Sequence, residues 1–150
     1  MINYHAPDLT RHPPRSPRVR LGGFVHLPRL IDKARATLAG TNGDYHYDCA
    51  TDALFWEFTG LSAAAFLAEV QSGKCDYDLL NWVMNRLSPK RSKCEIAAWS
   101  AWMEARVPTT TGGRAYFNEL HAAVGPRRED VATWFDLLDL EDFVCFGGKS

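Results

Sequence analysis

The sequence predicts a mainly α-helical fold: a single compact helical domain of about six or seven helices, a small two-stranded β element and an extended, proline-rich N-terminal arm. Three observations support this prediction. Apolar residues recur at helical spacing through most of the chain, capping residues and glycines mark where helices begin and end, and no segment sustains the alternation of a long strand. With 150 residues, 46% of them hydrophobic, the chain can bury one core without metals or disulfides.

Residues 1–23 form the predicted arm, and residues 24–150 form the helical domain on which we expect it to pack. The arm contains four prolines, two of them adjacent at Pro13-Pro14, and it ends at two consecutive glycines. Adjacent prolines favour extended backbone over helix. Because the arm has few apolar residues of its own, its order should depend on contacts with the rest of the chain.

The first helix is predicted over residues 28–39. A proline suits its first position, apolar residues follow at helical spacing, and Gly40 ends it. A turn is expected at Asn42-Gly43. The segment YHYDC, residues 45–49, then places tyrosines at alternate positions and predicts a short strand.

The rest of the chain is predicted to be helical in six places. These are ALFWEF (53–58), AAAFLAEVQ (63–71), LLNWVMNRL (79–87), IAAWSAWMEAR (96–106), RAYFNELHAAV (114–124) and EDVATWFDLL (129–138). The clearest start is the capping-box spacing of Ser92 and Glu95. The apolar, β-branched and aromatic tail FVCF, residues 143–146, predicts a second short strand that could pair with residues 45–49.

Charge is distributed unevenly along a nearly neutral chain. The formal net charge is −1, yet residues 11–40 hold seven of the 17 Lys and Arg residues, and residues 129–142 hold six acidic residues and no cation. The balanced total gives no reason to expect nucleic acid or a membrane as a partner, and the arm lacks the interleaved aromatics of a nucleic-acid site. A basic start and an acidic end can instead bind each other.

Cysteine and histidine usage bears on compartment and cofactors. The four cysteines are widely spaced without a CxxC pair, which predicts free thiols. The five histidines show no metal-ligand spacing, so we expect neither a metal nor another cofactor. Because no apolar leader or membrane-length segment is present, a soluble cytoplasmic protein is expected.

The basic helix is the first candidate for function. Arg29 and Lys33 are four residues apart and therefore share one face, and Asp32 can bridge to neighbouring cations. Three interpretations stay open. The face could be solvated and form ordinary ion pairs, it could bind an anionic ligand with help from Arg18 or Arg20, or it could form an internal clasp by binding the acidic C-terminal segment.

The YHYDC tract is the second candidate, because it gathers several reactive side chains. In an extended backbone, His46 and Asp48 would project to one face and form an oriented general base, while Tyr45 and Cys49 would project to the other. The alternative is that the tyrosines pack and His46 is an ordinary surface histidine.

Two functional hypotheses follow from these candidates. In the first, the protein is a small metal-independent enzyme or binder for an anionic metabolite: Arg29 and Lys33 hold the anion, Asp32 orients them, and His46 transfers protons with Asp48 or Tyr45. In the second, it is a non-catalytic interaction or regulatory module whose basic arm engages an acidic protein surface. A cavity lined by both cations and the histidine favours the first hypothesis, and a convex basic face favours the second. The paired aromatic helices are also compatible with a homodimer.

Several segments, taken in order, resemble a known family. They are RSPRVRLGGFVHLPRLIDKARATLAG, GDYHYDC, EIAAWSAWMEAR, YFNELHAAV and REDVATWFDLLDLEDFVCFGGK. Their combination is similar to a bacterial family described as a domain of unknown function, number 5069 in that series, over essentially Asp8 to Lys149. The resemblance implies a stand-alone cytoplasmic bacterial domain and supplies no activity, cofactor or catalytic residue.

Overall fold

The computed structural model describes residues 1–150 and confirms the mainly α-helical fold. Two short strands form an antiparallel hairpin, and seven helices follow them. In chain order the elements are β1 (Arg20–Leu21), β2 (Phe24–Val25), α1 (Leu27–Ala39), α2 (Ala50–Thr59), α3 (Ala63–Gln71), α4 (Asp76–Arg86), α5 (Lys93–Ala105), α6 (Thr111–Val124) and α7 (Trp134–Cys145).

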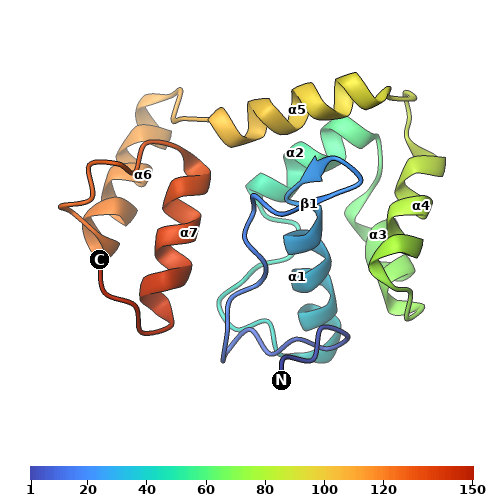
Figure 1. Ribbon diagram of the computed structural model, residues 1–150, viewed down its shortest axis with the longest axis horizontal. Helices are drawn as coiled ribbons and strands as arrows, with labels where there is room; N and C mark the ends of the chain where they lie inside the picture. Colours follow the sequence, from blue (N-terminus) through green and yellow to red (C-terminus); the bar gives the residue numbers. More distant parts are fainter.

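Helix α1 lies at the centre of the molecule. It stands between α7 on one side and α3 and α4 on the other, while α5 crosses one end of the molecule (Figure 1). All ten residues from Leu27 to Ala36 are buried. A helix buried on every side is normally apolar, yet this stretch carries Arg29, Asp32, Lys33 and Arg35. These charges therefore need partners inside the molecule.

The predicted strand pairing was wrong. The hairpin joins Arg20 to Val25 and Leu21 to Phe24 across two glycines with positive φ, and neither residues 45–49 nor residues 143–146 form a strand. The YHYDC tract is a loop because side chains, rather than a partner strand, bind its backbone. Most of FVCF continues α7, whose helical hydrogen bonds outweigh the β propensity of a short apolar run.

Local signals predicted the C-terminal ends of α1 through α6 to within one residue, whereas α2, α4, α5 and α6 each begin three residues before the predicted range. Helix α1 covers the predicted range 28–39 with one more residue at its start, and it ends at Gly40 in the left-handed conformation. The Ser92–Glu95 capping box begins α5 as predicted. Helix α7 begins later than expected, because Thr133 and Asp136 form a capping box that sets its start.

The N-terminal segment follows the surface of the helical body. Residues 1–19 contain turns but no helix or strand, and Leu9, Pro14 and Pro17 are buried. The predicted boundary after residue 23 falls inside the hairpin formed by β1 and β2.

Two hydrophobic clusters support the fold. The main cluster of 17 buried residues includes side chains from β2 and from each of the five helices α1 through α5, together with Phe135 of α7. A second cluster of four residues, Phe117, Val131, Leu137 and Leu140, holds α6 against α7. No single helix is long and apolar enough to cross a membrane; only α2 and α3 taken together, bent by 93°, reach that length and composition.

Candidate functional site

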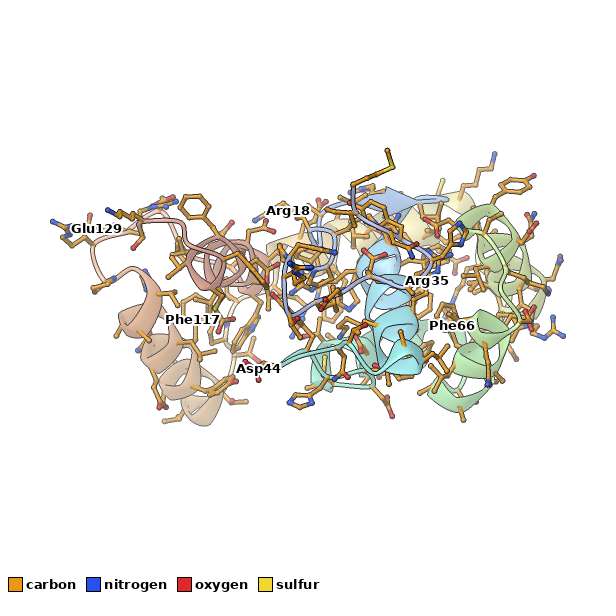
Figure 2. All side chains as sticks on the ribbon, turned by 90° about the horizontal axis from the view of Figure 1, so that it is seen from below. Arg18, Arg35, Asp44, Phe66, Phe117 and Glu129 are labelled. Carbon is orange, nitrogen blue, oxygen red and sulfur yellow. The ribbon has the colours of Figure 1, made fainter.

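A cavity of about 600 Å³ lies beside the first half of α1, next to the loop of residues 41–49 and the second half of α7. Figure 2 shows Asp44 on this loop, between α1 and the α6–α7 pair. Four of the residues predicted from the sequence line the cavity: Arg29 and Lys33 from α1, and Tyr45 and His46 from the loop.

Arg29 is bound by a carboxylate of α7. Its Nη1 donates to Oδ2 of Asp142 at 2.7 Å and its Nη2 donates to Oδ1 at 3.3 Å. The hydroxyl of Tyr45 donates to the same carboxylate at 2.7 Å, and the Tyr45 ring lies 5.5 Å from the guanidinium carbon of Arg29. Burial and the neighbouring Asp142 raise the pKa of Tyr45, so this phenol keeps its proton.

Lys33 is bound by Asp52, the buried carboxylate of α2. Its ammonium donates to both oxygens of Asp52 at 2.8 and 2.7 Å, to the carbonyl of His46 at 3.0 Å and to Sγ of Cys49 at 3.3 Å. Asp52 also accepts from the backbone N–H groups of Asp48 and Cys49. Burial alone would raise the pKa of Asp52, but the hydrogen bond from His26 and the charge of Lys33 hold it at about 2.

His26 completes this buried group, although it was not among the site residues predicted from the sequence. It lies directly before α1 with a side chain only 1% exposed, and its Nε2 lies 2.7 Å from Oδ1 of Asp52. Its Nδ1 is buried without a hydrogen-bond partner, and His26 also lines the cavity. Burial lowers the pKa of His26. No local motif marks this residue, because its partner Asp52 lies 26 positions away in the sequence.

Two predicted site residues lie away from the cavity. Asp32 faces the N-terminal segment, where it accepts from the backbone N–H of Arg15 and from its Nε and Nη2 at 2.8 to 2.9 Å. Asp48 accepts from the indole of Trp56 at 3.0 Å. No hydrogen bond joins Asp48 to His46, so the structure does not form the predicted histidine–aspartate pair.

The two second-tier arginines also lie outside the cavity lining. Arg18 binds Asp136 and Asp139 of α7, with 3.1 Å between its Nε and Oδ2 of Asp139. Arg20 binds Glu104 of α5 at 3.2 Å. The basic segment thus binds the acidic C-terminal helix at three carboxylates, counting Asp142, which is the arrangement described by the internal-clasp interpretation.

The cavity lining as a whole is not positively charged. Its two cations, Arg29 and Lys33, face three carboxylates, Asp44, Glu141 and Asp142, so its formal charge is 2 − 3 = −1. Burial, and then the charge of Asp142, raise the pKa of Glu141. The lining therefore combines internally neutralised cations with a carboxyl group that holds its proton more strongly than usual.

The remaining reactive groups of the chain are the cysteine thiols and the side chains that could bind a metal ion. All four cysteines are free thiols, and Cys49 and Cys145 line the cavity. No group of three or more His, Cys, Asp or Glu side chains is arranged to hold a metal ion.

Comparisons with known proteins agree with the resemblance seen in the sequence. A family model described as "Domain of unknown function (DUF5069)" matches residues 11–144, which is most of the chain. A search of curated proteins found no match.

Proposed function

The chain belongs to the DUF5069 family, and we propose that it binds a small polar metabolite in the cavity between α1 and α7, as a binder or as an enzyme that works without a metal. One observation carries this proposal: Arg29, Lys33 and His46 line one concavity of about 600 Å³ instead of spreading over a convex face. That volume falls within the range of roughly 300–1,000 Å³ that is common for small-molecule sites.

Charge balance supports a neutral or cationic ligand. The carboxylate of Asp142 already binds Arg29, and the three protons of the Lys33 ammonium go to Asp52, His46 and Cys49. An anion would have to displace one of these partners. A neutral or cationic ligand would leave them in place and would face the surplus carboxylate.

An anionic metabolite, as expected from the sequence, is the second candidate. It is favoured because Arg29, Lys33 and Asp142 all line the cavity, so that an anion could exchange with Asp142 on the guanidinium.

The interaction-module alternative has less support. Arg15, Arg18 and Arg20 each bind a carboxylate of the same chain, which leaves these arginines fewer donors for an acidic partner surface. A cytoplasmic location and a homodimer stay predictions.

A thermal-shift screen tests the proposal. Cationic, neutral and anionic metabolites are screened as matched sets, and a ligand at a hundred times its Kd should stabilise the protein by about 2.7 kcal/mol. Hits should weaken in Glu141→Gln, which removes a carboxylate of the cavity, and persist in Glu104→Gln, which removes a carboxylate outside it.

The screen also separates the two ligand classes. Hits confined to anions, with binding lost in Arg29→Gln, would support the second candidate. Stabilisation by no set, or hits unaffected by both cavity variants, would contradict binding in this cavity.

A further inference from the structure

We propose that Nδ1 of His26 is the hydrogen-bond acceptor that recognises the ligand, and hence that the ligand presents an O–H or N–H donor to the inner wall of the cavity. This inference rests on the proposed function and specifies the chemistry of the same cavity. It assigns a role to a residue that no sequence motif identified.

The hydrogen-bond partners of His26 determine which ring nitrogen carries the proton. Asp52 is ionised, since its pKa is about 2, and a carboxylate can only accept. The ring nitrogen 2.7 Å from Asp52, Nε2, must therefore be the protonated one. Because burial also lowers the pKa of His26, the ring is neutral near pH 7 and Nδ1 carries a free lone pair.

The unpaired nitrogen is unusual for its degree of burial. His26 is 1% exposed, and Nδ1 is one of only three buried side-chain nitrogen or oxygen atoms in the chain without a partner. Buried polar atoms are normally hydrogen-bonded, and exceptions often mark functional positions. Since His26 contributes to the cavity lining, a molecule in the cavity is the natural source of the missing donor.

The ring is held in this orientation from several sides. Asp52 binds Nε2 and is itself fixed by Lys33 and by two backbone N–H groups. The Phe135 ring stacks on the His26 ring, with 6.3 Å between the two ring centroids and an interplanar angle of 23°. His26 also has a φ of 68°, a left-handed conformation that is rare for a residue other than glycine.

The same arrangement supports proton transfer. A ligand O–H or N–H group that donates to Nδ1 could pass its proton to that nitrogen and keep the bonding electron pair. The resulting imidazolium would retain its Nε2–H bond to Asp52, whose negative charge lies 2.7 Å away. In such a step His26 would be the catalytic base, whereas Asp52 and Lys33 would be positioning residues.

The test is nitrogen NMR of the full chain labelled with 15N-histidine. His26 is identified by the loss of its signals in His26→Asn, chosen because asparagine tolerates positive φ, or by its contacts with Phe135 if that variant does not fold. We expect the wild-type ring near pH 7 to give the pattern of a neutral Nε2–H tautomer. A protonated ring or an Nδ1–H tautomer would overturn the inference before any ligand is added.

The second part of the test uses two cations of equal charge and similar size. Ethanolamine has N–H and O–H donors, and tetramethylammonium has none. Ethanolamine should shift the Nδ1 resonance of His26 in a saturable manner, and tetramethylammonium should not. An equal shift of the Nδ1 resonance with both cations would show that His26 does not recognise a hydrogen-bond donor, and it would overturn the inference.

The remaining outcomes separate this inference from the proposed function. If ethanolamine shifts the ring-nitrogen signals of His46 but not those of His26, the cavity binds ligands and the inference about His26 is wrong. If neither probe shifts a signal of His26 or His46, and no compound of the thermal-shift screen stabilises the protein, both proposals fail.

Discussion

The helical body, α1 to α5, and the α6–α7 pair are stabilised in different ways. All but one of the 17 residues of the main buried cluster belong to the body or its β2 strand, the exception being Phe135 of α7, and Phe24, Phe55 and Trp99 make edge-to-face contacts in this cluster. The α6–α7 pair has its own cluster of only four residues. Phe135 and Leu138 connect it to the main cluster, and ion pairs connect α7 to Arg18 of the N-terminal segment and to Arg29 of α1. The two units lie side by side, joined by α5 and by these contacts (Figure 1).

The difference explains where the cavity lies. Apolar side chains occupy the space between the helices of the body, and side chains of this kind normally pack closely in protein interiors. The contact of α7 with α1, the loop of residues 41–49 and the N-terminal segment is called the seam here. At the seam, the side chains of Arg29 and Tyr45 converge on the carboxylate of Asp142, where directional hydrogen bonds hold them. Pairing of this kind satisfies charges without filling volume, so the polar seam leaves room for a ligand where the aromatic core does not.

The largest expected effect concerns the buried group beneath the cavity. Asp52→Ala leaves Lys33 and His26 buried without their partner, and the free energy of unfolding should fall by about 3–5 kcal/mol. Chemical denaturation measures this change. The matched control, Asp130→Ala, removes an exposed carboxylate that binds only Arg128 and should leave the denaturation midpoint unchanged. Equal effects of the two substitutions would contradict the structural role of the buried group.

The seam itself should be less sensitive. Asp142→Asn removes the charge bound by Arg29 and Tyr45 but keeps a polar side chain, so we expect a loss of about 1.5–3 kcal/mol. Hydrogen exchange should rise in α6 and α7 more than in α3 and α4, because Asp142 connects only the former pair to α1. Equal acceleration of hydrogen exchange in all four helices would show that Asp142 does not stabilise the α6–α7 pair more than the body.

The pH dependence of stability offers a sharper comparison. Because burial lowers the pKa of His26 from its ordinary 6.5, the unfolded chain binds a proton below about pH 6.5 that the folded chain does not. Stability should therefore fall as the pH drops below that value, with a slope of at most about 1.4 kcal/mol per pH unit from this residue. His26→Asn should flatten the slope, whereas His5→Asn, at an exposed position, should not. Unfolding titrations between pH 7 and pH 5 measure both.

The smallest effect is expected at the exposed end of the seam. Arg18 is 40% exposed where it binds Asp136 and Asp139, so Arg18→Ala should cost about 0–1 kcal/mol. Added salt should reduce even that difference, since it screens exposed charges. A loss as large as that of Asp142→Asn would mean that the outer pairs contribute as much to holding α7 as the inner one.

Prediction from the sequence was most successful where the signal was local. The bounds of α1 and the capping box at Ser92 depend on residues within four positions of each other, and both are found in the structure. The strand at residues 143–146 was misplaced because a short apolar run fits helix and strand alike. The strand at residues 45–49 was misplaced because it depended on only two alternating tyrosines. The true hairpin at Gly22-Gly23 has only two residues in each strand, too few for a periodic pattern.

The candidate site was only partly predictable. Arg29, Lys33, Tyr45 and His46 were selected for their chemistry, and they do line one cavity. The acidic C-terminal segment was one predicted partner, and Arg29 does bind Asp142 there. The individual pairs could not be inferred, however, because helical spacing suggested Asp32 as the counter-ion within the same helix. In the structure, Asp32 binds Arg15.

The sequence by itself determined the helices, their caps and the presence of opposite charges at the two ends of the chain, since these follow from composition and from neighbours along the backbone. Only the tertiary structure decided which charges meet. Arg29 and Asp142 are 113 positions apart, and His26 and Asp52 are 26 apart. Such pairs form because packing buries residues 27–36 of α1 on all sides, and a charge removed from water must find an opposite charge or a hydrogen-bond partner wherever the fold brings one near.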